Sequence, residues 1–153
     1  MRHARSTTGS SSDLPSAASC RNTSRKTMSE PLRGVIVSHA AVAQALLAAV
    51  AAITGVNDAL VPVSNDGCDT GALADRLNQA IAGKPAVLFV DLPGGSCLTS
   101  SVRLARGKTD VAVVTGVNLA MLLDFVFHRD LPPGDAARRA AEAGSRAIRT
   151  PAA

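Results

Sequence analysis

Two side chains that could take part in group transfer, His39 and Asp91, each stand at the end of a short apolar run. A neutral imidazole is a good nucleophile when a carboxylate holds one ring nitrogen as N–H and leaves the other nitrogen free. Soon after Asp91, Gly94-Gly95-Ser96 opens a predicted helix, whose first N–H groups and hydroxyl suit a phosphoryl group. These residues therefore predict phosphoryl transfer through His39.

Each of these residues also has an ordinary structural interpretation. A single histidine at a strand end is frequently structural, and an aspartate after a strand commonly belongs to a turn. His128 is expected to end a helix, where a positive charge is favourable. Cys97 is expected to be structural, because no base is paired with it. The catalytic interpretation rests on finding His39 and Asp91 together at neighbouring strand ends.

The apolar runs before His39 and Asp91 indicate strands that are buried on both faces, as in parallel sheets. Pro62 lacks the N–H that a ladder needs, so its strand should lie at an edge. Right-handed crossovers then give the strand order 2-1-3-4, in an open three-layer α/β/α sandwich. The winding reverses between the first and third strands, where ligands bind in such sheets. This topology should bring His39 and Asp91 within hydrogen-bond reach.

Periodicity places helices between the strands. The helix predicted over 40–53 should bury Val42, Leu46, Val50 and Ile53, and the last helix, over 135–143, should stop at Gly144. An apolar helix over 119–127 is expected at a subunit interface. The predicted strands are 33–38, 59–64, 86–90 and 111–115, with a short final strand at 146–150, and further helices are predicted from 69 or 70 to 83 and over 96–106.

Composition limits the classes of protein. The 153 residues, 46% of them hydrophobic, suffice for one domain with a core. Residues 1–28 hold five Lys or Arg and one acid, which accounts for the net charge of +4, so the remainder predicts no nucleic-acid surface. Three Phe without Trp or Tyr also argue against binding to single-stranded nucleic acid.

The three cysteines are odd in number and have no C-x-x-C spacing, so we expect free thiols in the cytoplasm, with no metal site and no cofactor. The longest uncharged apolar run, 40–53, is too short to enter and span a bilayer. Residues 1–28 are expected to be a disordered or non-native tail, with a transit peptide or regulatory tail as the alternative. Residues 29–153 are expected to form the domain.

Three blocks carry a more specific signal when they are taken together and in order. They are Val35–His39, Val87–Ser96 and Val114–Leu122. The combination resembles the enzyme IIA domain of the mannose/fructose/sorbose family of the bacterial phosphoenolpyruvate-dependent sugar phosphotransferase system. The resemblance extends from about Arg33 to Thr150, and no single block would be as specific.

The resemblance implies a role for each matching residue. His39 would carry the phosphoryl group, Asp91 would orient the His39 ring, and Gly94, Gly95 and Ser96 would lie at the phosphate. The protein would accept phosphate from the histidine-containing phosphocarrier HPr and pass it to a separate IIB component. The family also implies a homodimer that exchanges a C-terminal strand, without insertion into the membrane, although a membrane permease could be associated through its partners. The sugar is not identified by these residues.

Some residues depart from the family pattern. A hydroxyl residue is common directly after the aspartate, where this chain has Leu92, and an aromatic residue is common where it has Pro93. These departures concern transfer rates and the choice of partner more than the chemistry. Two alternatives remain open. Phosphorylation of His39 could control binding to another protein, or the chain could be a flavodoxin-like nucleotide-binding domain, although it has no G-x-G-x-x-G or P-loop motif.

Overall fold

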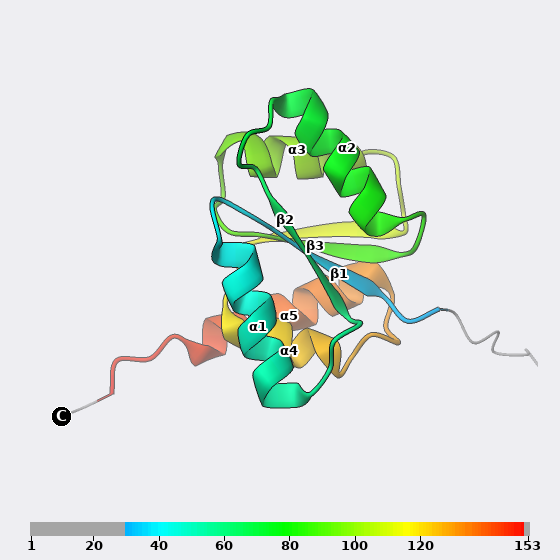
Figure 1. The fold of residues 1–153 in the computed structure, drawn as a ribbon. Coiled ribbons are helices and arrows are strands. Elements are labelled where there is room, and N and C mark those ends of the chain that lie inside the picture. The colour runs from blue at the N-terminus through cyan, green and yellow to red at the C-terminus, as the bar shows by residue number, and fades with distance from the viewer. Residues whose placement is uncertain (1–29, 152–153) are drawn as a thin grey trace, which may run out of the picture.

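The structure is a computed structural model that describes residues 30–151, and the expectations for residues 1–28 lie outside that range. Four strands alternate with helices along the described chain (Figure 1). The strands are β1 (Arg33–Ser38), β2 (Leu60–Ser64), β3 (Ala86–Val90) and β4 (Val111–Thr115). The helices are α1 (Val42–Thr54), α2 (Thr70–Ile81), α3 (Gly95–Ala105), α4 (Leu119–Val126) and α5 (Pro133–Ala147).

The four strands form a parallel sheet in the order β2-β1-β3-β4, which confirms the predicted topology. The two central strands are paired in a register that sets Val37 beside Val90. The residues that follow these two positions therefore leave the sheet at the same edge. This register places the turn after β1 next to the loop after β3.

Helices cover both faces of the sheet, with α2 and α3 on one side and α1, α4 and α5 on the other (Figure 1). Successive side chains of a strand point to opposite faces. Ile36 accordingly packs in the core under α1, α4 and α5, while Val35 and Val37 pack under α2 and α3. Because both faces are covered, β3 is apolar and buried at every position.

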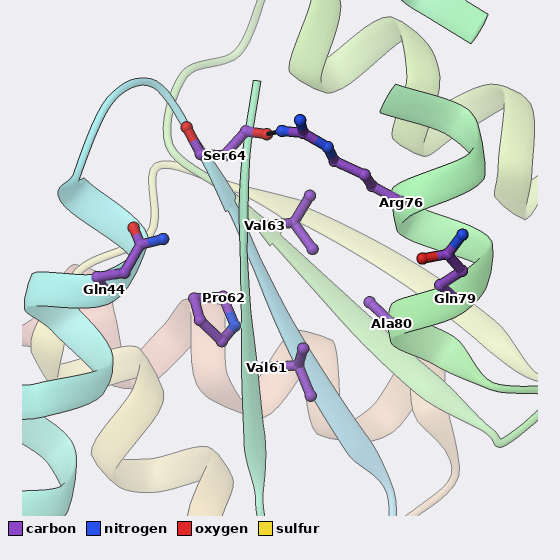
Figure 2. A pocket seen from close by; sticks show the side chains of 8 residues that line it. All are labelled: Gln44, Val61, Pro62, Val63, Ser64, Arg76, Gln79 and Ala80. Carbon is purple, nitrogen blue, oxygen red and sulfur yellow. Dashed lines mark hydrogen bonds between the residues drawn. The ribbon is translucent and has the colours of Figure 1, made fainter. Parts of the chain in front are cut away.

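The predicted edge position of the strand that contains Pro62 is confirmed, since β2 pairs only with β1. A hollow of about 430 Å³ lies along β2, and Figure 2 shows Pro62 in it between Gln44 of α1 and the helix α2. Arg76 of α2 donates hydrogen bonds from Nη1 to the carbonyls of Ser64, at 3.0 Å, and of Asp66, at 3.2 Å. The arginine thus satisfies backbone acceptors where the edge strand ends.

The predicted buried stripe of the first helix is right at Leu46 and Val50, which pack in the core, and wrong at its two ends. Val42 and Ile53 are exposed, whereas the sheet-facing side of α1 consists of Ala43, Leu46, Leu47, Val50 and Thr54, all buried or half-buried. The reason lies at the start of the helix, where the Ala43 N–H donates to the buried Ser38 hydroxyl at 2.8 Å. At the start of α1, Ala43 therefore takes the buried position that was expected for Val42.

Two predictions for the C-terminal region are also wrong. The last helix does not stop at Gly144 but continues to Ala147, and residues 146–150 form no strand. A Cβ added to Gly144 would lie 2.3 Å from Met121 Cγ, so this glycine permits the close approach of α5 to α4. Exchange of a C-terminal strand therefore has no preformed strand to act on. In the described part of the chain, none of the helices combines the length and apolar character needed to span a membrane.

Candidate active site

His39 lies in a tight turn between β1 and α1. The preceding residue, Ser38, is buried, and its hydroxyl donates to the His39 carbonyl at 3.3 Å while accepting the Ala43 N–H. The next residue, Ala40, has a φ of +49°, a conformation that residues with a Cβ adopt at a cost of about 1 kcal/mol. The turn therefore fixes the backbone of His39 from both sides.

Asp91 follows β3 and faces this turn. Its Oδ2 accepts the backbone N–H of His39 at 2.9 Å and lies 2.8 Å from the His39 ring Nδ1. Its Oδ1 accepts the backbone N–H of Leu92 at 2.8 Å. The contact expected from the topology is thus present, and every hydrogen bond of the Asp91 carboxylate holds it in one orientation.

The surroundings of Asp91 favour its ionised form. Burial alone would raise the pKa of Asp91. The opposite effect comes from the hydrogen bonds of the His39 backbone and ring, from the electrostatic effect of that ring and from the Leu92 N–H. Together these contacts outweigh burial and hold the pKa of Asp91 below its ordinary value. An ionised carboxylate only accepts hydrogen bonds, so Nδ1 must be the protonated nitrogen of His39. In the neutral imidazole, Nε2 is then left with a free lone pair.

The side chains of His39 and Asp91 differ in their exposure to solvent. The His39 side chain is 45% exposed and the Asp91 side chain only 13%. A partner could therefore reach the imidazole, whereas the carboxylate beside it is shielded from water. This arrangement suits a nucleophile that meets another macromolecule at the protein surface.

The loop after Asp91 supplies donors without side chains over them. Gly94 is extended, and Gly95 begins α3 with a φ of +78°, in a region that favours glycine. No side chain caps this helix, and a Cβ at either glycine would meet nothing within 4 Å. The first N–H groups of α3 therefore remain free to bind an anion. Ser96 is also exposed, and its hydroxyl accepts the Asn65 amide at 3.5 Å.

Two residues of the site were not predicted from the sequence. Asn65 was not recognised, and Cys97 was expected to have only a structural role. Asn65 directly follows β2 and contacts two other elements, since its N–H donates to the Ser38 carbonyl of β1 at 3.1 Å and its side-chain amide donates to the Ser96 hydroxyl in the first turn of α3. Cys97 is buried in the core under α2 and α3, yet its sulfur lies within 4.8 Å of ligand atoms of both His39 and Asp91. Burial and the Asp91 charge raise the pKa of Cys97, against the effect of a Ser96 hydrogen bond.

The other described histidine lies away from this site. His128 follows α4, and its Nδ1 is 2.7 Å from the Asp124 carbonyl, near the end of that helix. The structural role expected for it agrees with this contact.

Solved structures of other proteins have the same fold as this chain. A phosphotransferase system component EIIA from Streptococcus agalactiae has a TM-score of 0.72 at 22% identity, covering 78% of this chain and 96% of the other. A mannose/sorbose-specific IIA subunit from Enterococcus faecalis has a TM-score of 0.70 at 21% identity, covering 80% and 96%. At this level of identity the likeness shows the fold alone.

Sequence comparison supplies the family. No curated protein is significantly similar to the chain. The family described as "PTS system fructose IIA component" matches residues 34–142, which include the turn after β1, the loop after β3 and most of the sheet and helices. The chain therefore belongs to the mannose/fructose enzyme IIA family of the sugar phosphotransferase system.

Proposed function

We propose that this protein is a phosphohistidine carrier that accepts a phosphoryl group from HPr on Nε2 of His39 and passes it to a separate IIB component. Membership of the enzyme IIA family supports the phosphotransfer role. The observation that carries the residue assignment is the 2.8 Å contact between His39 Nδ1 and the shielded Asp91 carboxylate, because it leaves the Nε2 lone pair free on a side chain that is 45% exposed.

The proposed transfer requires no residue beyond this site. The Nε2 lone pair attacks the phosphorus of the donor's phosphohistidine, the donor P–N bond breaks, and its electron pair returns to the donor imidazole. The His39 ring becomes positively charged as the new P–N bond forms, and the Asp91 carboxylate stabilises that charge. Transfer to the IIB component repeats the exchange in the opposite direction.

The phosphoryl oxygens would meet the N-terminus of α3. Gly94, Gly95 and Ser96 are all exposed there, and the helix has no side-chain cap to compete for its N–H groups. Leu92 adds no hydroxyl and is 56% exposed, but its backbone N–H already serves Asp91. We therefore assign phosphate binding to the backbone of this loop and to the Ser96 hydroxyl.

Phosphorylation by the general enzymes of the system tests this proposal. Incubation with phosphoenolpyruvate, enzyme I and HPr should give a phosphorylated chain whose label is labile to acid and stable to base. His39→Ala should abolish labelling, whereas His128→Ala, a matched change at a histidine outside the site, should not. Labelling that survives in His39→Ala, or that is lost in His128→Ala, would contradict the assignment.

The cytoplasmic partners set the proposed location, since HPr and a IIB component both act there. The family match names a transport component and does not favour the alternative in which His39 phosphorylation controls another protein. Affinity capture with the phosphorylated and unphosphorylated chain compares the two. Recovery of a IIB component supports the carrier, and recovery of a kinase or transcription factor in only one state would support the alternative.

We also propose a homodimer, with a second copy of this chain as the occupant of an apolar groove between α4 and α5. Ile148 lines this groove of about 580 Å³ and is 77% exposed, although it directly follows α5. Ile148→Asp should lower the dimer fraction in analytical ultracentrifugation. Ile53→Asp, at an exposed position on α1, is the control, and equal effects of the two changes would contradict this interface.

A further inference from the structure

The His39–Asp91 pair has a third potential metal ligand beneath it. A ring nitrogen of His39, a carboxylate oxygen of Asp91 and the sulfur of Cys97 all lie within 4.8 Å of one another. Among residues 30–151, this is the one group of three such side chains that comes together in this way. The three come from different places, the turn after β1, the end of β3 and the first turn of α3.

We propose that His39, Asp91 and Cys97 form a binding site for a divalent transition metal ion of the Zn²⁺ class, and that the bound ion prevents His39 from accepting a phosphoryl group. The metal site stands on the geometry alone. Its effect on transfer rests on the proposed function.

The spacing is close to what such an ion needs. Zn²⁺ binds nitrogen, oxygen and sulfur at about 2.0–2.3 Å, so tetrahedral ligand atoms lie roughly 3.3–3.8 Å apart. The ligand atoms here, at no more than 4.8 Å, must close by up to about 1.5 Å, and if Nδ1 of His39 is the ligand it must move slightly away from Asp91 Oδ2, which lies 2.8 Å from it. His39 can supply this movement because its side chain is 45% exposed, while Cys97 is held in the core. The exposed side of His39 leaves a fourth position for water.

Charge and ligand type favour a borderline ion over Mg²⁺ or Ca²⁺. One carboxylate and one thiolate would balance the two positive charges of the ion, and the imidazole adds a neutral nitrogen. Thiolate and imidazole ligands select zinc and its neighbours, whereas Mg²⁺ and Ca²⁺ prefer oxygen. On binding, the Cys97 thiol releases its proton to solvent. The Leu92 N–H on Asp91 Oδ1 would keep the carboxylate oriented in the bound state.

Either ring nitrogen gives the same effect on His39. If the ion binds Nε2, the lone pair that attacks phosphorus is occupied. If it binds Nδ1, the proton of the neutral ring moves to Nε2, which again has no free lone pair. The ion also takes over the Asp91 oxygen that orients the ring. Metal binding and phosphorylation should therefore exclude each other.

Cobalt titration tests the site independently of transfer. Co²⁺ bound to a thiolate gives a charge-transfer absorption in the near ultraviolet, and the full chain should show it at one equivalent. A Cys20→Ser/Cys68→Ser double variant, in which Cys97 is the remaining cysteine, should keep the band, so the assignment does not depend on altering the buried residue. His39→Ala should lose it. Absence of the band, or its loss in the double variant, would overturn the site.

Transfer from preformed phospho-HPr tests the second part. One equivalent of Zn²⁺ should slow single-turnover phosphorylation of the chain at least tenfold. In Cys97→Ser, whose fold is checked by circular dichroism, the ratio of rates with and without Zn²⁺ should stay near one. A cobalt band without inhibition would overturn the coupling between metal and transfer. If the metal-free chain accepts no phosphate at all, the proposed function fails, and the cobalt band still decides the site.

Discussion

Replacing Asp91 with asparagine keeps the shape of the side chain and removes its charge. In the native site, Oδ2 serves two donors of His39 and Oδ1 serves the Leu92 N–H. An amide can accept with only one of its two ends. If its oxygen faces His39, its NH₂ group meets the Leu92 N–H. If its NH₂ group faces His39, the ring must accept at Nδ1, and the proton moves to Nε2.

The first orientation sets the minimum effect. Hydrogen bonds to charged groups contribute about 1.5–3 kcal/mol and neutral ones about 0.5–1.5 kcal/mol, so the ring bond loses about 1–1.5 kcal/mol. A barrier higher by about 1.4 kcal/mol corresponds to a tenfold lower rate. Molecules in the second orientation have no nucleophile at all and lower the rate further. We therefore expect Asp91→Asn to slow phosphoryl acceptance about tenfold to a hundredfold.

Rapid-quench measurement of transfer from phospho-HPr gives this rate directly. Asp66→Asn is the control, because it removes one negative charge from an exposed position next to Asn65 in the chain. Nitrogen NMR of labelled histidine reports the tautomer, which should be Nδ1–H in the native chain. A rate for Asp91→Asn within about threefold of the native rate, or a native ring that carries its proton on Nε2, would show that Asp91 does not orient His39 for transfer.

Three other predictions follow from the contacts. Gly144→Ala should destabilise the protein by about 1–2 kcal/mol in urea unfolding, because its Cβ would clash with Met121, whereas Gly134→Ala, with open space around it, should be neutral or stabilising. Because the folded pKa of Asp91 is depressed, the stability it contributes is present above about pH 4 and lost as the pH falls through its folded pKa, so the unfolding free energies of native and Asp91→Asn chains should converge in acid. Ser96→Ala should slow transfer by about threefold to tenfold, and an unchanged rate would exclude its hydroxyl from phosphate binding.

The sheet was predictable because its signals are local. A strand buried on both faces must be apolar at successive positions, and β3 is so from end to end. Pro62 marks the edge strand, and Asp69 and Asn118 cap α2 and α4 through hydrogen bonds to Ala72 and Met121, as their residue types suggest. Such signals depend on a residue and its neighbours in the chain, so they survive into the fold.

The failed predictions depend on contacts that residue type and periodicity do not encode. Gly144 has the residue type of a helix end, but its role is to let α5 approach Met121. The burial of Ala43 instead of Val42 at the start of α1 goes with the bond between Ala43 and Ser38, which periodicity alone does not show. At Gly144 tertiary packing overrode a local preference, and at the start of α1 a hydrogen bond across the preceding turn did so.

The candidate site, too, could be predicted only in part. His39 and Asp91 could be paired from the strand order, because parallel strands end at one edge of the sheet. Asn65 could not, since its bond to Ser96 joins the loop after β2 to the first turn of α3, and the sequence does not set the conformation of that loop. The proximity of Cys97 was hidden because metal ligands are recognised in sequences by short regular spacings, whereas this group is assembled by the fold.

The position of Cys97 raises the question of how His39 is kept available for phosphoryl transfer and not occupied by a metal ion. A carrier needs a histidine that is exposed to partners and held in one tautomer, and the shielded Asp91 provides the second property. The same two groups are ordinary metal ligands, and a nearby sulfur completes a set with affinity for zinc. The bonds from His39 and Leu92 that hold the pKa of Asp91 low also occupy its oxygens, so a metal must displace the ring from Oδ2 before it can bind there. The strength of that one hydrogen bond therefore sets both the reactivity of His39 and its resistance to metal, and weakening it should lower the first and the second together.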